Sequence, residues 1–301
     1  MGAHLGELYA LGTAVCWVFT AVFFTRAGER MGSMVVNLVR LVMALAVLCG
    51  VAWVTRGMPW PTDATAHAWT WLTISGVVGF TFGDLCLFRA FLLLGPRLST
   101  LVMSFAPPLT ALAGWLWLGE RLGPWQLAGM VATLLGVMWA ILDRTPSAGA
   151  LVSKKDRRWG VVLGFGGALG QALGLVLSKL GMGDYDAIAA NQIRVLGGTL
   201  GFVALFFVIR WWPRVWRGLA DREGMVYTAG GALLGPFLGV TLSLLAVQHT
   251  EAGVAASIMG TTPVLIIPWM VFVGRERVGV GGILGALVAT AGVAILFLAP
   301  G

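Results

Sequence analysis

A proline-containing apolar stretch occurs twice in the chain, and this duplication constrains the fold more than any other feature. The first copy, Ser99–Gly123, is an apolar run of helical length with a proline pair inside it and a Gly-Glu-Arg corner at its end. The second copy, Ala255–Gly279, repeats the pattern at one fixed offset (263 − 107 = 156). The matching pairs are Pro107 and Pro263, Glu120 and Glu276, Arg121 and Arg277, and Gly123 and Gly279. Such self-similarity indicates two copies of one structural unit.

The duplication extends well beyond these two stretches. Gly79, Gly83, Gly129 and Gly136 recur at the same offset as Gly235, Gly239, Gly285 and Gly292. Earlier in each half, Asn37 and Arg40 match Asn191 and Arg194 at a slightly shorter offset (191 − 37 = 154). An insertion of two residues in the second half explains the difference.

The composition indicates an integral membrane protein. Hydrophobic residues make up 58% of the chain and charged residues only 11%, whereas a soluble domain carries about 25% charged residues. Apolar runs of about 20 residues recur throughout, which is the length that crosses a bilayer as a helix. The basic residues lie in short clusters between these runs, which favours lipid contact and no nucleic-acid partner. The three cysteines lie within apolar runs without metal-site spacing, so we expect packing roles, no metal and no cofactor.

The apolar runs predict an all-α protein of ten transmembrane helices. Five runs fall in each half, and an odd number forces the halves to enter the membrane in opposite orientations, as in many secondary transporters. We therefore expect two inverted five-helix repeats, residues 1–142 and 159–301, joined by a polar linker at residues 143–158. The first run is interpreted as a retained helix and not as a signal peptide. The predicted spans are Leu5–Thr25, Ser33–Val54, Trp69–Leu92, Pro96–Leu118, Pro124–Leu142, Gly160–Leu180, Ala187–Ile209, Gly224–Gln248, Ala252–Gly274 and Gly279–Leu298.

Lysines and arginines collect in the loops on one side of the predicted bundle. Fourteen lie between spans 1–2, 3–4, 5–6, 7–8 and 9–10, and about three (Arg56, Arg121 and Lys179) lie on the other side. Because cytoplasmic loops carry the excess of these residues, the count predicts a multi-pass inner-membrane protein with both termini outside the cytoplasm. The fourteen are Arg26, Arg30, Arg97, Arg144, Lys154, Lys155, Arg157, Arg158, Arg210, Arg214, Arg217, Arg222, Arg275 and Arg277.

These motifs together resemble the drug/metabolite transporter superfamily, in its ten-span EamA-like branch. The resemblance covers nearly the whole chain and implies export of small solutes, often amino acids or other metabolites, without ATP hydrolysis. Members are usually described with both termini in the cytoplasm, which is the reverse of the charge count, and we follow the count. The residues that carry the resemblance are Trp17, Arg40, the Pro107 helix closing with Gly119-Glu120-Arg121-Leu122, Gly129, Gly136 and the stretch Thr250–Pro263.

Arg40 and Arg194 are the sharpest candidates for substrate contact. Each lies about two turns inside an apolar span and follows an asparagine, Asn37 or Asn191, three residues earlier on the same helix face. A positive charge at membrane depth costs about 2.5–3.5 kcal/mol on insertion scales, so it usually faces a cavity, a partner or a substrate. The functional interpretation is that the guanidinium groups hold a substrate carboxylate. The alternative is that they reach lipid headgroups or backbone carbonyls at cavity mouths.

Asp84 is the one carboxylate deep within a predicted span, and its repeat mate is Val240. It would serve either as a proton carrier for coupling or as a structural ion-pair partner of Arg40 or Arg89. Trp17 and its repeat mate Gln171 lie near the middle of the first and sixth spans. They are interpreted either as two walls of a cavity for a solute with a polar head or as plain packing residues.

Pro107, Pro108 and Pro263 remove backbone donors inside predicted helices and therefore predict kinks. Such a kink would serve as a gating hinge or as a fixed bend that shapes a cavity. Ser104, Thr261 and Thr262 are placed to bond the carbonyls that the prolines leave free. The Glu120–Arg121 and Glu276–Arg277 corners are interpreted as topology residues with little direct role.

Three function classes fit a chain of this kind, and we favour the first, a secondary exporter of small metabolites such as amino acids or amphipathic solutes. It would work by alternating access, as a monomer or a homodimer, with the substrate between Trp17, Arg40, Gln171 and Arg194. The second class is a lipid-modifying enzyme, which requires grouped catalytic side chains that the three histidines do not form. The third is a lipid or lipid-linked-sugar flippase on the same fold. The sequence lacks the GxxxxGK[ST] loop of an ATP-driven pump and the charged helix stripe of an ion channel.

Overall fold

The structure is a computed structural model that describes residues 4–143, 154–267 and 279–299. Every regular element in these ranges is helical, which confirms the all-α prediction. Nine helical segments there are long and apolar enough to cross a membrane, and Ala252–Leu265 is a shorter apolar segment at the start of the predicted ninth span. The elements of the first half are α1 (Leu5–Met31), α2 (Ser33–Arg56), α3 (Ala66–Gly76), η1 (Val77–Gly83), α4 (Asp84–Met103), α5 (Ala106–Ala113), η2 (Gly114–Leu118) and α6 (Pro124–Leu142).

Among the described residues, the second half follows the first with an extra helix and one further break. Helix α4 runs unbroken through the predicted loop between Leu92 and Pro96, whereas its counterpart in the second half is two helices, α11 and α12. The residues that match η2, 270–274, lie outside the described ranges. The extra element is the short helix α9 in the connection between the seventh and eighth spans, where the sequence had predicted only a loop. Helix α7 begins six residues before the predicted start at Gly160, within the polar stretch expected to be a linker. The elements are α7 (Lys154–Met182), α8 (Ala187–Val208), α9 (Trp212–Leu219), α10 (Arg222–Ala232), η3 (Leu233–Gly239), α11 (Val240–His249), α12 (Ala252–Met259), α13 (Thr262–Leu265) and α15 (Val280–Leu298).

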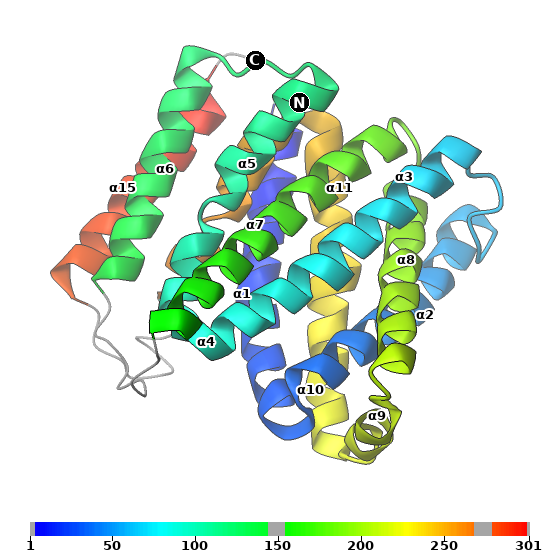
Figure 1. Cartoon of the computed structure of the whole chain (residues 1–301). Coiled ribbons are helices and arrows are strands. Elements are labelled where there is room, and N and C mark those ends of the chain that lie inside the picture. The colour runs from blue at the N-terminus through cyan, green and yellow to red at the C-terminus, as the bar shows by residue number, and fades with distance from the viewer. Residues whose placement is uncertain (1–3, 144–153, 268–278, 300–301) are drawn as a thin grey trace.

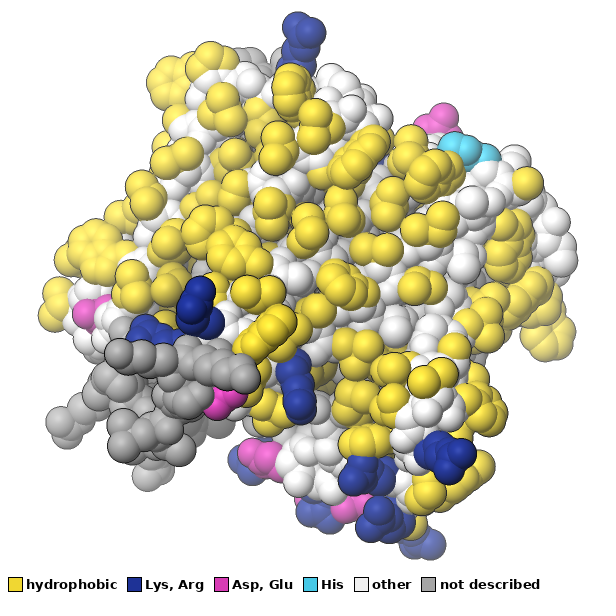
Figure 2. All heavy atoms as spheres, in the orientation of Figure 1, with side chains coloured by type: hydrophobic (Ala, Val, Ile, Leu, Met, Phe, Trp, Pro, Cys, Tyr) yellow, Lys and Arg dark blue, Asp and Glu magenta, His cyan; other side chains and the backbone are white. Residues whose placement is uncertain are grey.

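The bundle has two distinct ends. Both termini lie at the end drawn uppermost in Figure 1, which we call the terminal end; α1 runs away from it and α7 runs towards it. The opposite, linker end carries most of the basic side chains in view, whereas apolar side chains cover most of the visible face between the two ends (Figure 2). Trp53, Trp115 and Trp117 are all more than half exposed on this apolar surface, as expected for side chains that face lipid.

Within the described ranges, three helical segments have the wider π geometry, and two of them are repeat mates. Segment η1 spans Val77–Gly83 and η3 spans Leu233–Gly239, at the offset that relates the two halves (233 − 77 = 156). A π segment interrupts the regular ladder of helix hydrogen bonds and frequently marks a functional site. Both segments lie midway along their spans, so they introduce the same irregularity into each half of the bundle.

The predicted kinks occur at the prolines. Helix α4 ends at Met103 and α5 restarts with Pro107 and Pro108 in its first turn; α12 ends at Met259 and α13 restarts with Pro263 in its first turn. The hydroxyl of Thr262 donates to the carbonyl of Met259 at 2.9 Å, the carbonyl that Pro263 leaves without its usual donor. The role of these prolines in gating stays a prediction. The end of the ninth predicted span lies outside the described residues.

Glycines bring the central helices into backbone contact. A β-carbon at Gly170 of α7 would lie 2.6 Å from the Cα atom of Gly83, and one at Gly174 would lie 2.9 Å from that of Gly79. The same device joins the fifth and tenth spans, where a β-carbon at Gly129 would lie 3.0 Å from the carbonyl oxygen of Gly292. Small residues thus set how closely the helices pack, as is usual where no hydrophobic effect drives helices together.

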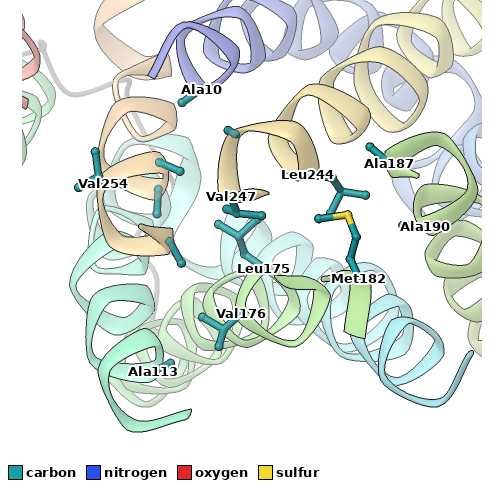
Figure 3. Close-up of a cluster of buried hydrophobic side chains, with 14 of the residues drawn as sticks. Ala10, Ala113, Leu175, Val176, Met182, Ala187, Ala190, Leu244, Val247 and Val254 are labelled. Atoms are coloured by element: carbon teal, nitrogen blue, oxygen red, sulfur yellow. The ribbon is translucent and has the colours of Figure 1, made fainter. Parts of the chain in front are cut away.

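An apolar cluster from both repeats fills the terminal end of the bundle (Figure 3). The first half contributes residues such as Ala10, Leu72 and Ala113, and the second contributes residues such as Val176 and Leu244. All five are at most 4% exposed. This cluster, which we call the terminal plug, consists of apolar side chains.

The glycine contact predicts a large effect of added volume. Replacing Gly170 with valine would force α7 away from η1, and overpacking of this kind typically costs about 1–3 kcal/mol. We expect a lower melting temperature in detergent than wild type, measured by tryptophan fluorescence. Gly50→Ala is the matched control, because a β-carbon there meets nothing within 4 Å; a Gly170→Val protein as stable as this control would contradict the packing account.

Candidate functional site

A buried ion pair forms the centre of the candidate site. The guanidinium of Arg40 on α2 pairs with Asp84, the first residue of α4. The amide of Gln171 on α7 donates to the other carboxylate oxygen, Oδ1, at 3.3 Å. Arg40 is 5% exposed and Asp84 6% exposed. Three spans, and both halves of the chain, therefore meet at one carboxylate.

Local structure explains why Asp84 reaches this position. It directly follows η1, whose glycines Gly79 and Gly83 pack against α7. The close approach of these backbones brings the start of α4 next to α7 and Gln171. Of the two ion-pair partners that the sequence left open, Arg40 and Arg89, the structure uses Arg40.

Arg194 has a different environment from its repeat mate Arg40. Its side chain is 6% exposed, its guanidinium lies over the ring of Phe80 at 5.2 Å, and it forms no ion pair within the described residues. Its Nε atom is buried without a hydrogen-bond partner in the same part of the chain. A β-carbon at Gly79 would lie 3.6 Å from its Nη2 atom, so the side chain extends along η1. Arg40 also lies over an aromatic ring, that of Phe24 at 5.1 Å, but has a carboxylate in addition.

The asparagines that precede the two arginines also differ. The amide of Asn191 donates to the carbonyl of Pro236 at 2.8 Å and to the hydroxyl of Thr241 at 3.0 Å. The interrupted ladder of η3 leaves that carbonyl free for a side-chain donor. Asn37, by contrast, is 1% exposed, and both polar atoms of its amide lack a partner among the described residues. A buried amide without partners costs free energy, so this group is available to a bound polar ligand.

The electrostatic balance of the site is positive. Arg40, Asp84 and Arg194 are the only buried charged side chains in the part of the chain that the structure describes. Arg40 is paired with Asp84, and Arg194 has no ion pair within the described residues, which leaves one positive charge uncompensated in a low-dielectric interior. Such a charge attracts an anionic group strongly, because little water competes for it.

Trp17 forms no hydrogen bond with this cluster within the described residues. It is half-buried and packs against an apolar cluster to which α2 and α8 contribute, while Gln171, its repeat mate, contacts Asp84 directly. Of the residues predicted to surround a substrate, the structure therefore joins Arg40 and Gln171 through Asp84 and leaves Arg194 free of ion pairs within the described ranges.

Sequence reasoning missed a second polar cluster at the terminal end. Glu120, interpreted as a corner residue, pairs with Lys179 at 2.6 Å and is only 11% exposed at its side chain. Farther along the same end, the hydroxyl of Tyr185 donates to Asp63 at 2.8 Å. That hydrogen bond lowers the pKa of the Asp63 carboxyl, while burial and the bond to Asp63 raise the pKa of Tyr185 to about 12. The contact is therefore intact at neutral pH and is lost only as the pH falls through the lowered pKa of Asp63.

Comparison with known proteins identifies the family. The model of the EamA-like transporter family matches residues 4–142 and again residues 158–298. The chain belongs to the EamA-like transporter family. This confirms the resemblance noted in the sequence and the two-repeat membrane architecture.

Individual EamA-like relatives cover nearly the whole chain. The uncharacterized inner membrane transporter YhbE of Escherichia coli (strain K12) is 26% identical over 96% of this chain and 90% of its own length. The proteins of that name from Escherichia coli O157:H7 and Shigella flexneri match equally well. A solved crystal structure with 17% sequence identity has the same fold, with a TM-score of 0.71 over 96% of this chain and 95% of its own.

The ion pair of this EamA-like protein predicts a non-additive mutational response. Arg40→Gln and Asp84→Asn each leave one buried charge unpaired, which typically costs about 3–5 kcal/mol, whereas the double variant leaves none. We expect both single variants to be less stable than the double variant Arg40→Gln/Asp84→Asn. Unfolding of the purified proteins in mixed micelles measures the coupling. Additive losses would show that the pair contributes no net interaction.

Proposed function

We propose that this protein is a secondary transporter that exports small metabolites carrying a carboxylate, such as amino acids, by alternating access. The observation that carries this proposal is the buried guanidinium of Arg194, which has no carboxylate partner within the described residues. An isolated buried charge is costly, and a substrate carboxylate would compensate it. The planar guanidinium suits such a group because it donates two parallel hydrogen bonds.

The surroundings of Arg194 support a solute with an apolar part. Phe80 lies beneath the guanidinium, and the half-buried Trp17 belongs to the apolar cluster on the same side of the bundle. The partnerless amide of Asn37 offers both a donor and an acceptor to further polar groups of the solute. Asp84 is already engaged by Arg40 and Gln171, so in this conformation it holds the site together.

Alternating access is supported by where the site lies. Its charged residues come from α2 and α4 of one repeat and from α8 of the other, so rocking of one repeat against the other would expose them in turn. The YhbE relatives are named inner membrane transporters, and we place this chain in the inner membrane as well. Its basic linker end would face the cytoplasm and both termini would face outward.

The transport proposal is tested by release of labelled solutes from proteoliposomes. The panel pairs each amino acid with its decarboxylated amine, so that only the carboxylate differs within a pair. We expect selective release of the carboxylated member, reduced about tenfold or more in Arg194→Gln, since hydrogen bonds to charged groups contribute about 1.5–3 kcal/mol. Arg121→Gln, an exposed arginine at the terminal end, is the matched control and should transport normally.

Three outcomes would redirect the proposal. Equal release of both members of each pair, unaffected by Arg194→Gln, would retain transport and remove the carboxylate site. Release of no solute, combined with scrambling of labelled lipid in the same vesicles, would favour the flippase. Release that depends on an imposed pH gradient would identify proton coupling and make Asp84 the residue to vary next.

The orientation is tested separately with reporters fused to the C-terminus. Alkaline phosphatase is active only outside the cytoplasm, and a cytoplasmic fluorescent protein only inside it. We expect an active phosphatase fusion, because fourteen basic residues lie in the loops of the opposite end. A fluorescent, phosphatase-inactive C-terminus would reverse the assignment of both ends.

A further inference from the structure

We propose that Glu120 and Lys179 form a lock that closes the terminal end of the transporter in its resting conformation. The inference rests on the alternating-access transport proposed above and adds the gating residues at one end. Lys179 Nζ lies 2.6 Å from Glu120 Oε1, and the two residues belong to different repeats. The ion pair therefore joins the halves that must separate when this end opens.

The backbone around Glu120 turns its side chain back into the bundle. Gly119 has a φ of 68°, in the left-handed region that glycine adopts without strain, and it reverses the chain after η2. Gly114 leaves room for the carboxylate, since a β-carbon there would lie 2.6 Å from Glu120 Oε2. The same oxygen accepts a hydrogen bond from the backbone N–H of Ala252 at 2.9 Å. Glu120 is thus held by two separate elements of the second repeat.

Further hydrogen bonds surround this pair, one within the second repeat and two between the repeats. Lys179 donates to the carbonyl of Thr250 at 2.7 Å, and the Thr250 hydroxyl donates to Glu7 at 3.2 Å. The amide of Gln126 donates to Glu251 at 3.1 Å. Each bond that involves a charged group is worth more than a neutral one. Together they tie α1, α6 and the η2 corner to α7 and the start of α12.

The lock lies between water and the apolar seal of the bundle. On the outer side of the lock is a cavity of about 430 Å³. Its lining includes Glu120 and Lys179 themselves, together with Glu7, His249 and Glu251. On its inner side is the terminal plug, which includes Val176, about one helical turn before Lys179 (Figure 3). Water thus reaches the polar bonds from outside, while the plug seals the path inward. Opening this end requires both layers to part.

The opposite end has no equivalent lock at the matching positions; the pairs that join the two halves there, those of Arg30 with Asp221 and Glu223, involve an arginine side chain that is 41% exposed. The repeat mate of Lys179 is Thr25 (179 − 154 = 25), which carries no charge and bonds to the carbonyl of Ala21. The repeat mate of Ala252 is Pro96 (252 − 156 = 96), which has no backbone N–H to donate. The second repeat has an acid at the position that matches Glu120, namely Glu276. The first repeat, however, has neither a lysine to match Lys179 nor a backbone N–H to match that of Ala252. Two ends related by the duplication are therefore closed by different chemistry.

This asymmetry gives the carrier a preferred resting conformation. The Glu120–Lys179 pair is more buried than the Arg30 pairs of the linker end and has several supporting bonds, so the empty carrier rests with the terminal end closed. A solute would then enter from the linker end, which the basic loops assign to the cytoplasm. Binding energy at the central site would be needed to part the lock, which favours export over uptake.

The lock is tested by measuring the distance across the terminal end. Spin labels are placed at Arg121→Cys in the first repeat and His249→Cys in the second, with the native cysteines replaced by alanine, and the protein is reconstituted in nanodiscs. We expect a single short-distance population. Glu120→Gln and Lys179→Met should each raise the ratio of long-distance to short-distance molecules about tenfold, a shift of about 1.4 kcal/mol. The charge-reversed double variant Glu120→Lys/Lys179→Glu should return part of that shift, because it restores the ion pair but not the bond to Ala252.

The control is Arg30→Gln, which breaks the pairs of Arg30 with Asp221 and Glu223 at the linker end. It should leave the distance across the terminal end unchanged. Single variants at Glu120 and Lys179 that also leave it unchanged would overturn the lock, as would a charge-reversed variant no more closed than Glu120→Gln. The measurement requires no solute, so the lock and the proposed transport activity succeed or fail independently.

Discussion

The cost of placing charge in hydrocarbon governs this structure. A membrane span accepts a guanidinium only where something compensates it. Arg40 has that compensation in Asp84, with Gln171 supporting the carboxylate from a third span. Arg194 lies at the matching place in the other repeat and, among the described residues, has an aromatic ring and no anion. The transporter is thus built around one neutralised charge and one that a ligand would neutralise.

Arg40 and Arg194 occupy matching positions in the two repeats, but the residues around them have diverged, so the two arginines have different environments. At the position matching Asp84 the second repeat has Val240, so only one arginine has an acid to pair with. At the position matching Phe80 it has Pro236, whose carbonyl holds Asn191 instead. The terminal and linker ends have diverged in the same manner. In each case the two repeats share a backbone arrangement but carry side chains that fit only one half, so the internal symmetry of the fold does not extend to the charged residues.

The sequence predicted those features that depend on period and composition. Apolar runs predicted the helices, the fixed offset predicted two repeats, and the prolines predicted the breaks before α5 and α13. The π segments η1 and η3 were not predicted, because the residues of a wider turn are those of any glycine-rich membrane helix. The repeated glycines at Gly79 and Gly235 were a visible signal, yet they indicate close packing and not helix geometry.

Pairings between distant residues were the hardest to predict. Asp84 had two possible arginine partners, and only the packing of α4 against α7 selects Arg40. Glu120 was interpreted as a topology and corner residue with little direct role because it lies at a predicted helix end. Its contact with Lys179 depends on how the two repeats meet, which neither local propensity nor hydropathy records. Helix α9 was missed because its Trp- and Arg-rich sequence has the composition of an interfacial loop.

The central claim is that Arg194 is an uncompensated buried charge in the empty protein, and its most direct test is the stability of the Arg194→Met variant without ligand. Methionine has a similar length and retains favourable contact with the Phe80 ring, so the substitution removes the charge with little loss of packing. The account predicts a higher melting temperature than wild type in the same detergent, as expected when a functional residue is held at a cost in stability. A melting temperature clearly below wild type would show that Arg194 is compensated within the protein and would contradict its role as an open site for a substrate carboxylate.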